Sequence, residues 1–188
     1  MISVVIKKTN IDQSEEAKEL RDSMLSTVLD NYQSDTVKVA RWGKPYLENC
    51  NVGFSISHSG SAILSAVNCE RKATPQKDGL NFYFEGGNDF EIGADIEVLG
   101  KRKLDSLLKI SNKRFSSAER QLINESLDKE AAVLEVWTKK EAYLKLTGDG
   151  LKGIADSDTE QLKKDYIFYT QKISLDNKEY ILSVCVKR

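Results

Sequence analysis

The chain has 188 residues, with 28 Lys or Arg against 29 Asp or Glu and a formal net charge of −1. This balance argues against a general nucleic-acid coat, because proteins of that class are typically basic. The three cysteines are far apart and form no C-x-x-C pair, which argues against a structural zinc site or a secreted disulfide scaffold. No segment is apolar enough to span a membrane, and the first lysines follow the short N-terminal apolar stretch, the reverse of a signal peptide. We expect a cytoplasmic protein of one domain or two small halves.

Residues 12–31 predict an amphipathic helix. Asp12 stands three positions before Glu15, the spacing of a capping box, and apolar side chains then recur on one helical stripe. Short strands are predicted next, at 36–40, 52–56 and 62–68. Between 70 and 90, glycines and a proline punctuate a possible hairpin with alternating aromatic residues, which we interpret as a peripheral excursion.

The second half is predicted to start with a strand at 91–99 and to end with two more. Three helices are expected after the first of these strands, near 103–110, 117–127 and 129–147. The two final strands are expected at 165–172 and 179–187. The middle helix begins with Ser116, three residues before Glu119. An internal echo joins "AILSAVN" at 62–68 to "YILSVCV" at 180–186, which favours a duplication, with chance similarity between strands as the alternative.

The segment "GADIE" places Asp95 and Glu97 two residues apart on the predicted strand. Side chains alternate along a strand, so both carboxylates project from one face while Ile92 and its even-numbered neighbours pack on the other. Adjacent carboxylates repel each other unless a cation lies between them, and oxygen ligands suit Mg²⁺. Two ordinary acids on an exposed strand face are the alternative, which a third acid nearby would disfavour.

The predicted helix at 129–147 offers that third acid. Trp137, Glu141 and Lys145 lie four residues apart and share one stripe. This stripe would suit a metal-bound diphosphate, with Glu141 on the ion and Lys145 on a phosphate oxygen. The alternative is a surface Glu-to-Lys pair, which stabilises a helix by only roughly 0.3 kcal/mol. Gly148 ends the helix, either to allow close approach of the backbone or simply as a C-cap.

Two further motifs could bind a nucleotide. "FSISHSG" places His58, the only histidine, between Ser57 and Ser59. Hydroxyls, backbone N–H groups and an imidazole at a turn can hold a phosphate, although a structural histidine explains the motif equally well. "RWGKPYL" combines Arg41 and Lys44 in a stiff basic turn that could border a nucleotide or be any surface turn.

Taken in order, "GKPYL", "FSISHSG", "IGADIE" and "VWTKKEAYLKLTGDGL" resemble the signature set of the Sfp-type 4′-phosphopantetheinyl transferases. The family pattern G-x-D-[IV]-E is matched by residues 93–97, and W-[ST]-x-K-E-[AS]-x-x-K by residues 137–145. The resemblance covers residues 41–68 and 92–152.

The resemblance implies transfer of the phosphopantetheine arm of coenzyme A (CoA) to a serine of an apo acyl or peptidyl carrier protein, with release of 3′,5′-ADP. By family analogy, Asp95, Glu97 and Glu141 would hold Mg²⁺ on the diphosphate, and Glu141 would help to deprotonate the attacking serine. Lys140 and Lys145 would form a lysine pair at the CoA site, with Lys145 neutralising diphosphate charge.

The remaining site residues are also implied by the resemblance. Gly43, Lys44 and Pro45 would border the adenine, and Ser57 and His58 would hold the 3′-phosphate. The implied fold is α+β, a pseudo-two-fold repeat of two similar halves in one chain. Residues 1–91 would form the adenine and 3′-phosphate side of the CoA site, and residues 92–188 the Mg²⁺-binding and catalytic side. A monomer is expected, because such a chain supplies its own interface.

Residues 101–114, "KRKLDSLLKISNKR", carry six positive charges against Asp105. They could dock an acidic carrier protein by charge complementarity, or be a solvated helix face. Two other functions stay open: a non-catalytic module that binds CoA or a carrier protein, and another Mg²⁺-dependent enzyme acting on a nucleotide diphosphate. The acid triad disfavours the first, and the lysine pair with the "GKP" and "SHS" motifs disfavours the second.

Overall fold

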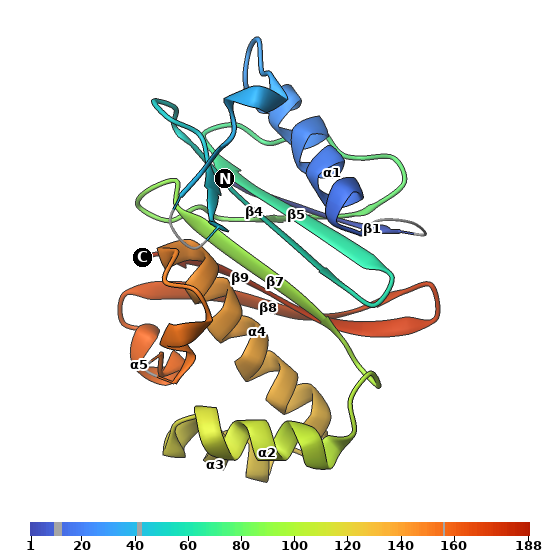
Figure 1. Ribbon diagram of the computed structural model, residues 1–188, viewed down its shortest axis with the longest axis vertical. Helices are drawn as coiled ribbons and strands as arrows, with labels where there is room; N and C mark the ends of the chain where they lie inside the picture. The colour runs from blue at the N-terminus through green and yellow to red at the C-terminus, as the bar shows by residue number, and fades with distance from the viewer. Residues whose placement is uncertain (10–12, 41–42, 156) are drawn as a thin grey trace.

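The computed structural model describes residues 1–9, 13–40, 43–155 and 157–188. The first half of the chain forms an antiparallel sheet in the order β4-β5-β1-β6, with one helix packed against it (Figure 1). Its main elements are β1 (Ile2–Lys8), α1 (Gln13–Val28), β4 (Val52–Ser59), β5 (Ala62–Cys69) and β6 (Leu80–Phe84). The predicted stripe of α1 is confirmed, because its apolar residues pack in one core cluster, namely Ala17, Leu20, Met24 and Val28. The proposed helix start at Asp12 lies outside the described residues.

In its described residues, the segment between α1 and β4 carries little regular structure. These residues form a 3₁₀ turn and a two-stranded ladder, η1 (Ser34–Thr36), β2 (Lys38–Val39) and β3 (Pro45–Tyr46). The strand predicted at 36–40 is therefore reduced to β2. Gly43 stands just before β3 with φ +86°, a conformation that glycine adopts without strain.

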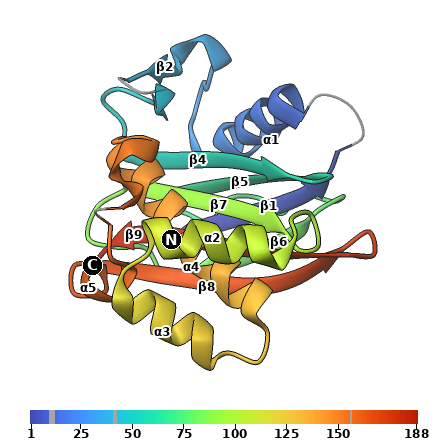
Figure 2. The ribbon, with the colours of Figure 1, turned by 60° about the horizontal axis from the view of Figure 1, so that its bottom comes forward.

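The second half forms a three-stranded antiparallel sheet in the order β7-β9-β8. Its elements are β7 (Ile92–Val98), α2 (Leu104–Arg114), α3 (Ser117–Glu125), α4 (Lys129–Thr147), η3 (Leu151–Ile154), α5 (Thr159–Leu162), β8 (Tyr166–Leu175) and β9 (Lys178–Lys187). The predicted capping box is confirmed, since Ser116 and Glu119 each accept from the other's backbone N–H at the start of α3. In the second view α1 lies above the strands, α2 in front of them and α3 below them (Figure 2).

The two halves repeat one topology, which confirms the predicted pseudo-two-fold α+β fold. In each half a strand and a helix are followed by two strands, the last of which is central, so that β1-α1-β4-β5 corresponds to β7-α4-β8-β9. The strand register agrees with the sequence echo. Ile6 pairs with Leu64 in the first sheet, and Ile96 pairs with Leu182 in the second. All four side chains lie in one core cluster between the sheets.

The segment at 70–90 differs from the prediction. It contains a single strand, β6, which pairs with β1 instead of forming a hairpin within the segment. Nor is it peripheral, because Phe82 and Phe84 pack against the central core and Phe84 stacks on Tyr169 of β8, with ring centroids 4.6 Å apart. The strand β1 was not predicted from the sequence, and β6 pairs with one of its edges. None of the helices in the described ranges has the length and apolar character needed to cross a bilayer.

Candidate active site

The candidate site begins with an unusually close contact between β7 and α4. A Cβ atom at Gly93 would lie 1.8 Å from the carbonyl oxygen of Ala142 and 2.6 Å from the amide nitrogen of Leu146. Only glycine fits there, because both contacts are with helix backbone, which has no rotamer to change. The contact brings Glu141, the residue before Ala142, to the acidic face of β7.

The acidic face of β7 follows the predicted alternation. Ile92, Ala94 and Ile96 are buried in the core between the sheets, while Asp95 and Glu97 point the other way, toward donors. Asp95 is 6% exposed, and its Oδ1 lies 2.8 Å from the ammonium nitrogen of Lys145. Lys145 therefore serves as a counter-ion within the acidic group.

Glu141 lies close enough to these acids for their charges to act on it. Its burial, followed by the charge of Asp95 and more weakly that of Glu97, raises the pKa of Glu141 to about 7, against the opposing effect of Lys145. A carboxyl group with a pKa near neutrality can exchange a proton under physiological conditions. Burial and surrounding negative charge thus give Glu141 different chemistry from an ordinary surface acid.

The same donor set fits a divalent cation chemically. Three carboxylates repel each other at one place, and Mg²⁺ prefers oxygen ligands, usually keeping waters or phosphate oxygens in its remaining positions. Within the described ranges, however, no three acidic, histidine or cysteine side chains converge into a ready metal cage. The structure brings Asp95, Glu97 and Glu141 into one neighbourhood, and their role as metal ligands stays a prediction.

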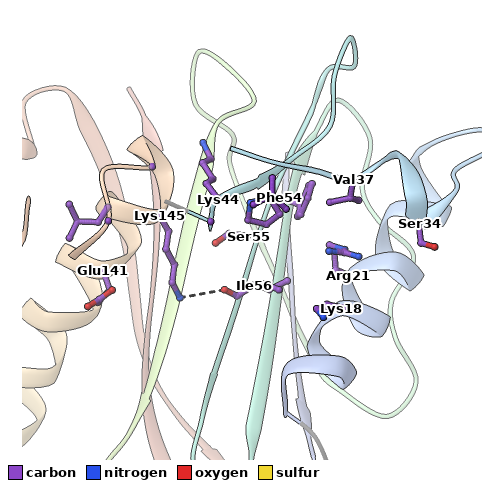
Figure 3. A pocket seen from close by; sticks show the side chains of 16 residues that line it. Lys18, Arg21, Ser34, Val37, Lys44, Phe54, Ser55, Ile56, Glu141 and Lys145 are labelled. Carbon is purple, nitrogen blue, oxygen red and sulfur yellow. Dashed lines mark hydrogen bonds between the residues drawn. The ribbon is translucent and has the colours of Figure 1, made fainter. Parts of the chain in front are cut away.

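A cavity of about 520 Å³ opens between the two halves beside this acidic group (Figure 3). Its walls include five of the residues predicted from the sequence, Gly43, Lys44, Pro45, Glu141 and Lys145. Glu141 and Lys145 come from α4, whereas the other three lie at the start of β3. Motifs about a hundred residues apart in the sequence therefore meet in one cleft.

Lys44 ties the turn to the end of α4. Its ammonium group donates to the carbonyl oxygen of Leu146 at 2.6 Å and pairs with Glu91. Gly148, the left-handed C-cap of α4, lies against the aliphatic part of Lys44, where a Cβ would be 3.4 Å from its Cδ. The glycine after α4 therefore permits close approach of the "GKP" turn as well as ending the helix.

Two basic residues of the cavity were missed by the sequence analysis. Lys18 and Arg21 stand on α1 and line the wall opposite Lys145 (Figure 3). Arg21 is held by an ion pair with Asp22 at 2.7 Å and lies over the ring of Phe54, 5.6 Å from its centroid. Their spacing of three residues puts them on one helix face, but the sequence alone does not tell which polar residues of an amphipathic helix border a cleft.

The predicted metal ligands Asp95 and Glu97 do not line the cavity, and neither do three of the predicted CoA-binding residues. The Ser57 hydroxyl is buried and donates to Asp95 at 2.7 Å. His58 is exposed on the other face of β4. Lys140 is fully buried in an ion pair with Glu119 at 3.0 Å, because it faces α3 while Glu141, the next residue of the helix, faces the cleft. Their predicted contacts with CoA are untested.

Comparison with known proteins identifies the family of the chain. The family profile of the 4′-phosphopantetheinyl transferase superfamily matches residues 91–185. The chain belongs to this superfamily. The match spans β7, α4 and the last two strands, and so includes Asp95, Glu97, Glu141 and Lys145. The α1 wall of the cavity lies outside it.

Two curated 4′-phosphopantetheinyl transferases are similar in sequence. The chain is 30% identical over 126 residues to psf-1 of Bacillus pumilus, covering 65% of this chain and 44% of that protein. It is 32% identical over 115 residues to HetI of Nostoc sp., covering 58% of this chain and 40% of that protein. The chain thus spans less than half the length of these curated relatives.

Among solved structures, the chain is similar to the crystal structure of Thermotoga maritima holo-[acyl-carrier-protein] synthase. The two are 18% identical with a TM-score of 0.34, over 52% of this chain and 64% of that one.

Proposed function

We propose that this protein transfers the 4′-phosphopantetheine arm of CoA to a serine of an apo acyl or peptidyl carrier protein and releases 3′,5′-ADP. Membership of the superfamily supports the reaction class. The observation that carries the proposal is the position of Glu141, whose pKa is raised to about 7, on the wall of a cleft that also presents Lys18, Arg21 and Lys145. A cleft with cations on both walls suits a ligand with phosphates at two places, as in CoA.

In the proposed reaction, the serine oxygen of the carrier protein attacks the phosphorus atom that bears the pantetheine. A new oxygen–phosphorus bond forms, the bond to the leaving 3′,5′-ADP breaks, and Glu141 accepts the serine proton, directly or through water. A base with a pKa near the working pH suits this proton transfer. Lys145 would neutralise charge on the diphosphate, because transfer of a phosphoryl group asks mainly for alignment and compensating cations.

The group that the acids would hold is Mg²⁺. Asp95, Glu97 and Glu141 supply the oxygen ligands that this ion prefers, and their mutual repulsion in its absence favours its binding. When bound, the ion would neutralise negative charge on the diphosphate oxygens as a Lewis acid.

We assign the rest of the CoA molecule to the first half of the chain. Lys44, between Gly43 and Pro45, would border the adenine, and Lys18 and Arg21 extend the basic wall available to the 3′-phosphate. Ser57 and His58 are further candidates for that phosphate by resemblance alone. Lys140 would act on CoA only indirectly, by fixing the helix that carries Glu141.

We also propose the roles of the two halves, the location of the enzyme and its docking surface. Residues 1–91 would provide the adenine and 3′-phosphate side, and residues 92–188 the metal-binding and catalytic side, in a monomer of the cytoplasm. The acidic carrier protein would dock on residues 101–114, most of whose side chains are exposed along α2. No nucleic acid or membrane partner is proposed.

The decisive experiment is incubation with CoA, Mg²⁺ and a panel of apo carrier proteins from fatty-acid, polyketide and peptide synthesis. Mass spectrometry would show a gain of one phosphopantetheine on the carrier serine. Glu141→Gln, which keeps the shape of the side chain, should remain folded and abolish the gain. Binding of CoA without transfer by the unaltered protein would indicate a binding module, and cleavage of CoA without a modified carrier would indicate a hydrolase.

A further inference from the structure

Three serines alternate along β4, and all their hydroxyl groups face β7. Ser55, Ser57 and Ser59 are each at most 6% exposed. The Ser55 hydroxyl accepts from the amide of Ala94 at 3.0 Å, and the Ser59 hydroxyl accepts from the amide of Val98 at 3.2 Å. Hydroxyl groups of β4 thus accept hydrogen bonds from backbone amides at the edge of β7, as the backbone carbonyls of a neighbouring strand would do. This row of hydroxyl groups forms a hydrogen-bonded contact between β4 of the first half and β7 of the second.

Two of the hydroxyl groups also donate to the acids of the candidate site. The Ser57 hydroxyl donates to Oδ1 of Asp95, and the Ser59 hydroxyl donates to Oε2 of Glu97, both at 2.7 Å. Both bonds join residues 38 apart, so the two strands run side by side in the same direction with one constant offset. Because side chains alternate on both strands, every second serine meets every second acid.

The two acids depend on these serines to different degrees. Asp95 is held by Ser57 and also by Lys145. Glu97 has Ser59 as its one hydrogen-bond or ion-pair partner within the described part of the chain. A short bond from a hydroxyl to a carboxylate is charge-assisted and restricts the rotamer of the acid, while leaving its second oxygen open.

We propose that Ser57 and Ser59 are positioning residues, through which β4 of the first half sets the orientation of Asp95 and Glu97 in the second half. The acidic group is then completed only where the two halves meet. The bonds oppose the tendency of two neighbouring carboxylates to turn away from each other. The inference deepens the proposed function, on which its metal-binding consequence rests.

Ser59→Ala gives the clearer test, because Ser57 has a second predicted role at the phosphate. The expected result is a loss of Mg²⁺ affinity of about 10-fold to 100-fold, the usual effect of removing a residue that orients a metal ligand. CoA affinity measured without metal should stay within about two-fold, since Ser59 does not line the cavity. Calorimetric titration of each ligand into the purified protein measures both.

Ser55→Ala is the matched control. It removes a hydroxyl from the same strand and leaves an amide of β7 without its partner, as Ser59→Ala does, but its bonds are only to the backbone of Ala94. Its Mg²⁺ affinity should stay within about two-fold of the unaltered protein. Equal losses in the two variants would overturn the inference, because they would assign the effect to the weakened contact between β4 and β7 and not to the orientation of Glu97.

A crystal structure of Ser59→Ala without metal separates this inference from the proposed function. The Glu97 carboxylate should leave the position that it has in the unaltered protein. If it stays in place, or if the variant binds Mg²⁺ as tightly as the unaltered protein, Ser59 is not a positioning residue. If the unaltered protein binds no Mg²⁺ but Glu97 moves in the variant, the proposed metal is wrong and the positioning role stands.

Discussion

Gly93→Ala should reduce the proposed phosphopantetheine transfer sharply while leaving every predicted site residue in place in the sequence. The added Cβ would lie 1.8 Å from the Ala142 carbonyl oxygen, and real Cβ atoms essentially never come closer than 3.0 Å to another atom. Backbone lies on both sides of the contact, so α4 must retreat from β7 by more than 1 Å. Glu141 precedes Ala142 and would retreat with it, away from Asp95.

The expected magnitude follows from that displacement. A shift of about 1 Å in a positioned catalytic group can reduce the rate about 100-fold. Overpacking of this kind also destabilises a fold by about 1–3 kcal/mol. We therefore expect kcat for carrier modification to fall about 100-fold, with a moderate loss of stability in denaturant unfolding followed by circular dichroism. Initial rates of carrier modification at saturating CoA, followed by mass spectrometry, measure kcat.

Gly87→Ala is the control for Gly93→Ala. Its Cβ would lie 1.9 Å from the Lys187 carbonyl oxygen, an equally severe clash with backbone. Neither residue lines the cavity or belongs to the acidic group. Gly87→Ala should lose comparable stability and keep transfer within a few-fold. Full turnover by Gly93→Ala, or an equal loss of turnover in both variants, would refute the link between this close contact and the chemistry.

Three other outcomes are expected. Without metal, the raised pKa of Glu141, about 7, means that the folded protein loses stability as pH rises from about 4.5 to 7. Glu141→Gln should therefore have a free energy of unfolding about 1–2 kcal/mol higher than the unaltered protein at pH 8, after allowance for solvent screening, and the same free energy of unfolding at pH 4. A difference that does not depend on pH would contradict this. Lys140→Met leaves Glu119 buried without its ion-pair partner and should lower the free energy of unfolding by about 3–5 kcal/mol in denaturant titration; a well-folded variant with weaker CoA binding would instead assign Lys140 to the ligand. Lys109→Glu with Lys113→Glu should raise KM for an acidic carrier protein about 10-fold at low salt and leave KM for CoA unchanged, and an effect that persists in 1 M salt would argue against charge complementarity.

Alternation and helical periodicity predicted most of the fold and the acidic part of the site. Asp95 and Glu97 share a face of β7 because any strand places alternate residues together. Helix α3 begins at its capping box because Ser116 and Glu119 bond locally. Such features depend on residues close in sequence, so the sequence alone reveals them.

Features that depend on distant contacts were not predictable in the same way. The partner of β6 is β1, more than seventy residues away, and nothing in the local pattern distinguishes this pairing from a hairpin. Ser57 was expected beside a phosphate, yet its hydroxyl bonds a carboxylate of the other half. Lys18 borders the cleft only because α1 packs as it does on β4 and β5.

The duplicated topology also explains why the acidic group lies in only one half. Matching Ile6 with Ile96 through their partners on the central strands makes Val5 the counterpart of Asp95. Val5 is buried beneath α1 and contributes to an apolar cluster, so this half uses the space between helix and sheet for stability. In the second half the corresponding position is a carboxylate, and glycine at 93 lets α4 approach closely enough for Glu141 to join it. The energetic penalty of gathering carboxylates there must be offset by apolar burial elsewhere, and the core shared by both sheets, which contains Ile6 and Ile96, is placed to do so.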